Sequence, residues 1–191
     1  MKINKLDITE LNFKKTPNLK YYEFNQKIFI DVLPVSKEII DLAKSIPVIR
    51  KDHHKTNYFE EKPKEINEKG QKIFEHFQSF FSKILNYYKF KEFITTHWWI
   101  QRYNKNDNHD LHTHGHFMNE LSYIIYLQCS PQSAKTVFYM PGYPYIQIGD
   151  PLKIQPQSGM CVLFPSYMPH SVEPNNDSDR IIMSGNIKVI E

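Results

Sequence analysis

The second half of the chain is a succession of short apolar segments separated by turn sequences. Five segments are rich in β-branched and aromatic residues, a composition that favours strands over helices: 93–103, 121–128, 135–140, 159–165 and 180–190. The sequences PGYP, GDP, PQSG and PNNDSD lie between some of them and predict turns. This spacing indicates an antiparallel β-sandwich or barrel.

The first half of the chain has the periodicity of helices. Ser36 can cap a helix that runs through EIIDLAKSI and ends at Pro47. Apolar residues spaced by three and four predict a longer helix over residues 64–88, and Pro63 stands where a helix can begin. FIDVLP (29–34) predicts an edge strand. The expected fold class is therefore mainly β with buttressing helices, α+β overall.

Length and composition favour one domain. The chain has 191 residues, of which 40% are hydrophobic and 14% aromatic, enough for one well-filled core. We expect a single domain over residues 1–191. Residues 1–90 would form an N-terminal helical buttress, and residues 91–191 the β core that carries the functional site.

Charge and cysteine usage exclude several classes of partner. The net charge is +3 with acids and bases mixed along the chain, so no nucleic-acid patch is expected. Cys129 and Cys161 show no paired spacing and are interpreted as reduced thiols of a cytosolic protein. No run approaches the roughly 20 apolar residues of a membrane span, and no apolar leader is apparent. We therefore expect a cytoplasmic protein without a membrane partner.

A histidine cluster, HDLHTHGH (109–116), holds four of the nine histidines. Neutral imidazole is the commonest metal ligand in proteins. If this stretch is a strand, His112 and His114 point to the same face, because residues i and i+2 do so. The strand GMCVLFPSYMPH ends at His170 and supplies a third candidate. Three such ligands would leave metal positions open for other molecules.

Residues 98–187 resemble the 2-oxoglutarate- and iron(II)-dependent oxygenases, most closely the prolyl-4-hydroxylase-like branch and its small phage and bacterial relatives. The resemblance lies in RYNKNDNHDLHTH (102–114), LSYIIYLQ (121–128), KTVFY (135–139) and SGMCVLFPSYMPHSVEPNNDSDRIIMSGNI (158–187). It implies a double-stranded β-helix, or jelly-roll, core. Residues 1–90 are matched only by their helical character.

The resemblance assigns a role to each of five residues. His112 matches the first iron-binding histidine and His170 the distal one. Arg180 matches the basic residue that pairs with the far carboxylate of 2-oxoglutarate, a task that suits the guanidinium fork. Tyr126 and Tyr103 match tyrosines that face the same cosubstrate. The cofactors implied are Fe(II) and 2-oxoglutarate.

The sequence departs from the family pattern at one position. The usual motif is HxD or HxE, and His114 stands where the carboxylate is expected. Either His114 itself binds, or Glu120 supplies the carboxylate, or water takes the third position; we favour His114. Asp110 is disfavoured because a residue two before His112 in a strand lies roughly 7 Å away.

The implied activity is oxidative decarboxylation of 2-oxoglutarate coupled to hydroxylation of a substrate. The sequence does not identify that substrate: the prolyl-hydroxylase-like resemblance favours a protein side chain, and a small molecule or a nucleotide stays open because fold-level analogy does not decide function. Four aromatic residues are candidates for the pocket wall, although core packing explains each of them as well: Trp98, Trp99, Tyr123 and Phe138.

Two rival interpretations remain. A cupin has the same barrel architecture and would use His114, His116, Glu120 and His170, as an isomerase, a dioxygenase or a sugar-binding module. It offers no use for the DRIIMSGNI segment. A non-catalytic interaction domain is the other alternative. In the oxygenase interpretation, His109 and His116 are expected at the rim of the site.

Overall fold

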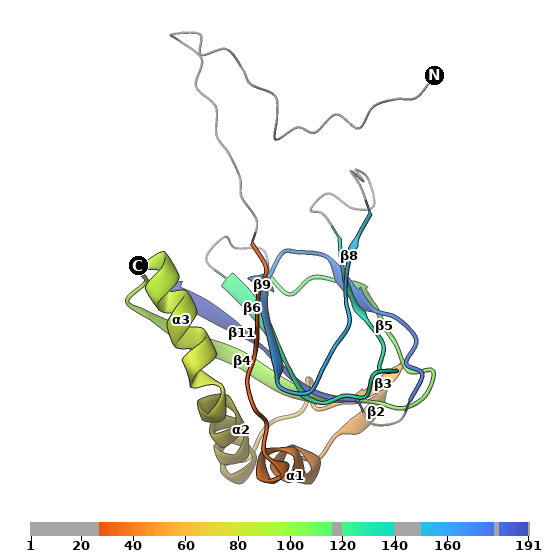
Figure 1. Ribbon diagram of the computed structural model, residues 1–191. Coiled ribbons are helices and arrows are strands. Elements are labelled where there is room, and N and C mark those ends of the chain that lie inside the picture. The colour runs from red at the N-terminus through yellow and green to blue at the C-terminus, as the bar shows by residue number, and fades with distance from the viewer. Residues whose placement is uncertain (1–26, 116–119, 140–149, 178–179, 191) are drawn as a thin grey trace, which may run out of the picture.

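Two antiparallel sheets and three helices make up the described part of the chain. The computed structural model describes residues 27–115, 120–139, 150–177 and 180–190. The larger sheet has the order β1 (Phe29–Val32), β9 (Met160–Pro165), β6 (Glu120–Gln128), β11 (Arg180–Ile190), β4 (Glu92–Tyr103), β3 (His54–Thr56), β2 (Ile49–Lys51). The smaller has the order β5 (His109–His112), β10 (His170–Val172), β7 (Thr136–Phe138), β8 (Leu152–Ile154). Figure 1 shows α2 and α3 along one side of the larger sheet, away from the smaller one.

The middle of the larger sheet is buried on both faces, and its side chains alternate between them. On β6, Ile124 and Tyr126 pack between the two sheets, whereas Tyr123, Ile125 and Leu127 belong to the core shared with the helices. A strand with two buried faces is expected to be a continuous apolar run, and LSYIIYLQ is one. The helices therefore buttress one face and leave the other to enclose the site.

The first helix, α1 (Lys37–Ser45), begins where the sequence predicts. The Ser36 side chain accepts a hydrogen bond from the Ile39 backbone N–H at 3.3 Å, which caps the helix. The edge strand predicted at FIDVLP is also present, because β1 pairs only with β9 at one end of the larger sheet. Among the described helices, none is long and apolar enough to span a membrane.

The single long helix predicted over residues 64–88 is wrong. Two helices, α2 (Lys64–His76) and α3 (Gln78–Tyr88), meet at Phe77, whose φ and ψ of −101° and 9° interrupt the helix. The apolar spacing continues across the break because Phe77 is itself fully buried in the same core. Periodicity alone therefore does not reveal the change of direction.

The strand prediction also needs correction on the smaller sheet. The strand predicted at residues 159–165 is present as β9, which starts at Met160 and ends at Pro165. His170 begins β10 of the other sheet instead of ending β9. The short strands β2, β3 and β8 were not predicted. Since β1, β2 and β3 all join the larger sheet, the first 90 residues contribute strands as well as helices.

Cys129 and Cys161 are both free thiols.

We predict that Phe81→Ala lowers the free energy of unfolding by about 3–5 kcal/mol, because it leaves a cavity between α3 and the sheet. Phe81 is 1% exposed, and its ring lies 4.5 Å from Phe74 and 5.2 Å from Tyr123, centroid to centroid. Urea unfolding measures the change. Ser79→Ala, at an exposed position of the same helix, is the control; equal effects of the two substitutions would contradict this description of the core.

Candidate metal centre

Three imidazoles meet in the interior between the two sheets. One ring nitrogen from each of His112, His114 and His170 lies within 4.8 Å of the others. The antiparallel pairing of β5 with β10 sets His112 directly opposite His170. The ring centroids of that pair are 4.2 Å apart. Among the described residues, these are the only three side chains that form such a group.

His114 points toward the other two histidines, but strand geometry, which the prediction assumed, is not the reason. The strand β5 ends at His112, so His114 is not on a strand and strand alternation does not orient it. The backbone N–H groups of His114 and Gly115 instead both donate to the Ser166 carbonyl, at 2.8 and 3.2 Å. Ser166 follows β9 directly, so the turn after that strand holds the segment that carries His114.

Two of the three rings have a fixed tautomer. The Nδ1 of His112 lies 2.6 Å from the Asp110 carbonyl, and the Nδ1 of His170 lies 3.0 Å from the Met168 carbonyl. A carbonyl can only accept, so each Nδ1 carries the proton. The Nε2 of each ring then keeps its lone pair, which is the state a metal requires.

Burial keeps all three imidazoles neutral. Burial, followed by the neighbouring His112, lowers the pKa of His114 to about 3. Burial, followed by His112 and His114, holds the pKa of His170 well below its usual value. Burial also lowers the pKa of His112, against an opposing effect of the Asp110 carbonyl. The three imidazoles are therefore uncharged, so each keeps a ring nitrogen with a lone pair that can bind a metal.

The alternative ligands lie elsewhere or are not described. Glu120 is outside the group of converging ligand atoms, and its carboxylate lies against Gly115, 2.4 Å from where a Cβ on that glycine would be. The Asp110 carboxylate is mostly exposed and faces His53 at 3.8 Å. His116 lies outside the described residues.

Arg180 is a buried cation without a carboxylate partner among the described residues. It is 0% exposed, and its guanidinium carbon lies 4.3 Å from the centroid of the Tyr103 ring. Its Nη2 donates to the Thr136 hydroxyl at 3.1 Å. In the described part of the chain, its Nε and Nη1 and the Tyr103 hydroxyl have no hydrogen-bond partner. Three buried hydrogen-bond donors, two on Arg180 and one on Tyr103, therefore have no acceptor among the described residues.

Tyr126 lies beside the same guanidinium, but its hydroxyl is occupied. It donates to the Thr136 hydroxyl at 2.6 Å, and its ring centroid is 5.5 Å from the Arg180 guanidinium carbon. Thr136 accepts from both side chains, so its own hydroxyl proton is available for a further partner. Nothing in the sequence distinguishes Thr136, since a threonine in a strand is ordinary.

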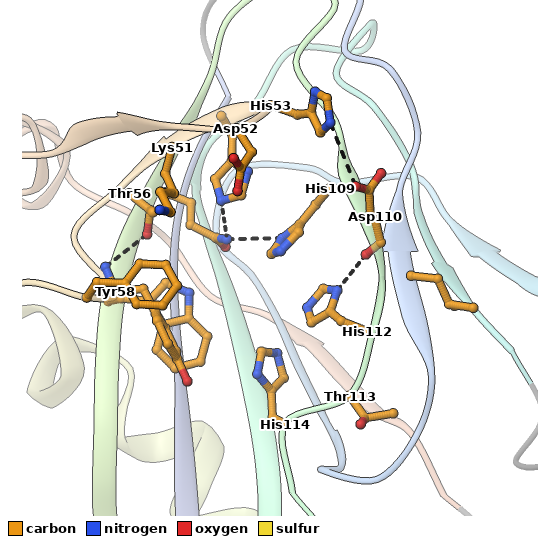
Figure 2. A pocket seen from close by; sticks show the side chains of 15 residues that line it. Lys51, Asp52, His53, Thr56, Tyr58, His109, Asp110, His112, Thr113 and His114 are labelled. Atoms are coloured by element: carbon orange, nitrogen blue, oxygen red, sulfur yellow. Dashed lines mark hydrogen bonds and ion pairs between the residues drawn. The ribbon is translucent and has the colours of Figure 1, made fainter.

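Two cavities that share lining residues adjoin the histidines, and Figure 2 shows the outer one. The outer one has a volume of about 300 Å³ and lies between the turn of β2 and β3 and the strand β5; its walls include Tyr58, Phe59 and Trp99. The inner one, about 20 Å³, is lined by all three histidines and by Tyr103. Trp99, Gln101, His109, His112 and His114 line both. The histidines therefore stand where an open pocket meets the protein interior.

The four aromatic candidates for the pocket wall divide between pocket and core. Trp99 lines both cavities, and Tyr123 lines the inner one. Trp98 packs against Gly70 of α2, on the helix side of the sheet. Phe138 stacks on His170 at 5.8 Å and belongs to the core between the sheets.

His109, expected at the rim of the site, lines both cavities and contacts one of the converging histidines. Its ring stacks on His112, with centroids 4.0 Å apart and planes 20° from parallel. Its other face is beside His54 at 4.3 Å. Burial lowers the pKa of His54 to about 4 and that of His109 well below its usual value. Two further neutral imidazoles therefore adjoin the three that converge.

The C-terminal half of the chain matches the model of a known family. Residues 97–186 match the family model described as "Putative 2OG-Fe(II) oxygenase". This segment contains all three converging histidines and Arg180. The cofactors that give the family its name, Fe(II) and 2-oxoglutarate, are those expected from the sequence. None of the curated proteins matches the chain.

Solved structures with the same fold are distant in sequence. A 2OG-Fe(II) oxygenase family oxidoreductase from Burkholderia pseudomallei has 16% identity and a TM-score of 0.61, over 79% of this chain and 76% of that one. The viral collagen prolyl hydroxylase of Paramecium Bursaria Chlorella virus-1, in a 2OG complex, has 14% identity and a TM-score of 0.54, over 86% and 96%. HygX from Streptomyces hygroscopicus, with nickel, 2-oxoglutarate and hygromycin B bound, has 8% identity and a TM-score of 0.56, over 85% and 83%.

These likenesses confirm the fold class expected from the sequence, a mainly β jelly-roll core buttressed by helices. The family match covers the strands that carry the histidine cluster and Arg180. Residues 97–186 thus match the sequence model of the family that the resemblance indicated, and the described chain shares its fold with these solved structures.

Proposed function

We propose that this protein is an Fe(II)- and 2-oxoglutarate-dependent oxygenase that hydroxylates its substrate. The observation that carries the proposal is the combination, in one interior, of three converging neutral imidazoles and an unpaired buried arginine. A metal site alone would fit a cupin equally well. The cupin pattern, however, gives no role to a buried cation at Arg180.

His112, His114 and His170 are the proposed metal ligands. Imidazole nitrogens suit iron among the first-row divalent metals, and a three-residue face leaves positions for other ligands. The hydrogen bonds from Nδ1 of His112 and His170 direct each Nε2 lone pair, as in metal sites generally. Bound Fe(II) would supply the oxygen chemistry, while the protein holds the ligands and excludes water.

Arg180 is the proposed partner of the far carboxylate of 2-oxoglutarate. Leaving a buried charge unpaired costs several kcal/mol, and a carboxylate would provide the missing acceptor for Nε and Nη1. The free Tyr103 hydroxyl is a third donor on the same side. Thr136 orients the guanidinium through the bond to Nη2 and connects it to Tyr126.

The inner cavity must widen to admit the cosubstrate. Its volume of about 20 Å³ holds one water molecule and is smaller than a five-carbon diacid. The side chains that separate it from the outer pocket are those that line both cavities, Gln101 and His109 among them.

The outer pocket is the proposed substrate site. Its volume of about 300 Å³ is at the lower end of the range for small-molecule sites, and it opens directly onto His112 and His114. A protein side chain or a small molecule fits this volume. Proteins of similar fold include both a collagen prolyl hydroxylase and one with hygromycin B bound, so the fold alone leaves the choice open.

We predict that Arg180→Met weakens 2-oxoglutarate binding about 100-fold or more, because it removes a charge-assisted partner of a buried carboxylate. Calorimetric titration of 2-oxoglutarate into Mn(II)-loaded protein measures this without turnover. Arg50→Met is the matched control, because Arg50 is half exposed and pairs with Asp107 away from the site. Unchanged 2-oxoglutarate affinity in Arg180→Met would remove the main support for the proposal.

The third ligand can be identified by comparing two substitutions. We predict that His114→Ala weakens Mn(II) affinity about 100-fold, whereas Glu120→Ala leaves it unchanged, because Glu120 is outside the converging group. Metal titration followed by electron paramagnetic resonance measures free Mn(II) in both. The opposite order would identify Glu120 as the ligand. Full affinity in both variants would favour water at that position.

A turnover assay separates the oxygenase from its rivals. With Fe(II), oxygen and a pool of candidate substrates, we expect succinate to form from 2-oxoglutarate, and no succinate from Arg180→Met. A cupin or a non-catalytic binding module would bind metal in both proteins and consume no 2-oxoglutarate in either.

A further inference from the structure

The three proposed metal ligands are not equally well supported by the backbone. His170 lies on β10, which pairs with β5 on one side and β7 on the other. His114 is held by two backbone hydrogen bonds to Ser166. His112 ends β5, the edge strand of the smaller sheet, and the pairing of β5 with β10 shifts register between His112 and His109. The His112 ring therefore depends most on its side-chain neighbours.

The neighbour that covers the His112 ring is His109. The two rings are nearly parallel, 20° apart, with centroids separated by 4.0 Å (Figure 2). A ring stacked in this way prevents His112 from turning about its Cβ–Cγ bond. The Nδ1 bond to the Asp110 carbonyl fixes one edge of His112, and His109 fixes one of its faces.

His109 is in turn held by Gln101. The Nε2 of Gln101 lies 3.2 Å from the Nδ1 of His109 and 3.2 Å from the Nε2 of His54. An amide nitrogen has two hydrogens, so one side chain can bond both rings at once. The Ser184 hydroxyl lies 3.4 Å from the Gln101 Oε1, which turns the amide nitrogen toward the rings.

Gln101 is well placed to act as a fixed point. It is 4% exposed and lies on β4, where its backbone pairs with Ile182 of β11 on one side and Thr56 of β3 on the other. Its position is thus set by the middle of the larger sheet, whereas β5 is in the smaller sheet. The Gln101–His109 contact ties the two sheets together beside the proposed ligands.

We propose that Gln101 is a positioning residue for the metal centre that acts through His109. Its amide holds the His109 ring against His112 and so fixes the direction of the His112 Nε2. The inference rests on the proposed function, because it assumes that His112 binds the metal. It adds Gln101, with His54 as the second ring bonded by the same amide, to the residues that form the centre.

The test is a Co(II) titration of the whole protein, read both as a dissociation constant and as the visible ligand-field spectrum. We expect Gln101→Met, which keeps the length of the side chain but removes both donors, to weaken Co(II) binding about 10- to 100-fold and to change the spectrum. His76→Ala is the control: it removes an imidazole from α2, where its Nε2 lies 2.8 Å from the Pro34 carbonyl and it lines neither cavity, so both readouts should stay unchanged.

A double-mutant cycle tests whether Gln101 acts through His109. His109→Phe keeps a ring beside His112 but has no nitrogen for the amide to bond. Adding Gln101→Met to His109→Phe should weaken Co(II) binding no further. An equal loss in both backgrounds would overturn the proposal, because Gln101 would then act independently of His109.

Two outcomes separate this inference from the proposed function. If the unaltered protein binds no Co(II), the metal centre itself fails and the inference fails with it. If it binds Co(II), and Gln101→Met has the same dissociation constant and spectrum, only the positioning role is overturned. Should Gln101→Met not fold, His109→Ala carries the test: it should show the same loss of affinity, and unchanged affinity would overturn the proposal.

Discussion

The pairing of β11 with both β4 and β6 determines where the charged and aromatic groups of the site lie. Arg180, the first residue of β11, is set opposite Tyr103 on β4. Two residues later, Ile182 is opposite Tyr126 on β6 and Gln101 on β4. A shift of this register by one residue would turn every one of these side chains to the helix-covered face. The helices α2 and α3 secure the register by burying the other face.

The three converging histidines lie on the smaller sheet or directly after its strand β5. Because they are neutral, they affect the net charge of the site. Three neutral imidazoles leave the charge of a divalent metal uncompensated, whereas the HxD pattern of the family would contribute one negative charge. Arg180 adds another positive charge without a carboxylate among the described residues. A dianion such as 2-oxoglutarate would neutralise Arg180 with its far carboxylate and half of the metal charge with its near one. The replacement of the acid by His114 would then leave one net positive charge at the loaded site.

The sequence predicted the elements with strong local signals. The Ser36 cap and the eleven-residue strand β11 (Arg180–Ile190) are where capping chemistry and a long β-branched run place them. The three-residue strands β3 and β10 are too short and too polar to show alternation. The helix break at Phe77 was missed because a buried phenylalanine continues the apolar spacing.

The same limit applies to the site. A motif and a resemblance were sufficient to select His112, His114, His170 and Arg180. The roles of Thr136 and Gln101 depend on which strands pair and in what register. The sequence of a single strand does not specify its partners or its register. The stacking of His109 on His112 likewise follows from the bulged pairing of β5 with β10, which the sequence alone does not reveal.

A crystal structure with Mn(II) and 2-oxoglutarate would show how the metal and the cosubstrate are bound. We expect an anomalous peak bonded to His112, His114 and His170, with the far carboxylate of 2-oxoglutarate on Arg180. A metal bound by other residues, or a carboxylate turned away from Arg180, would contradict it.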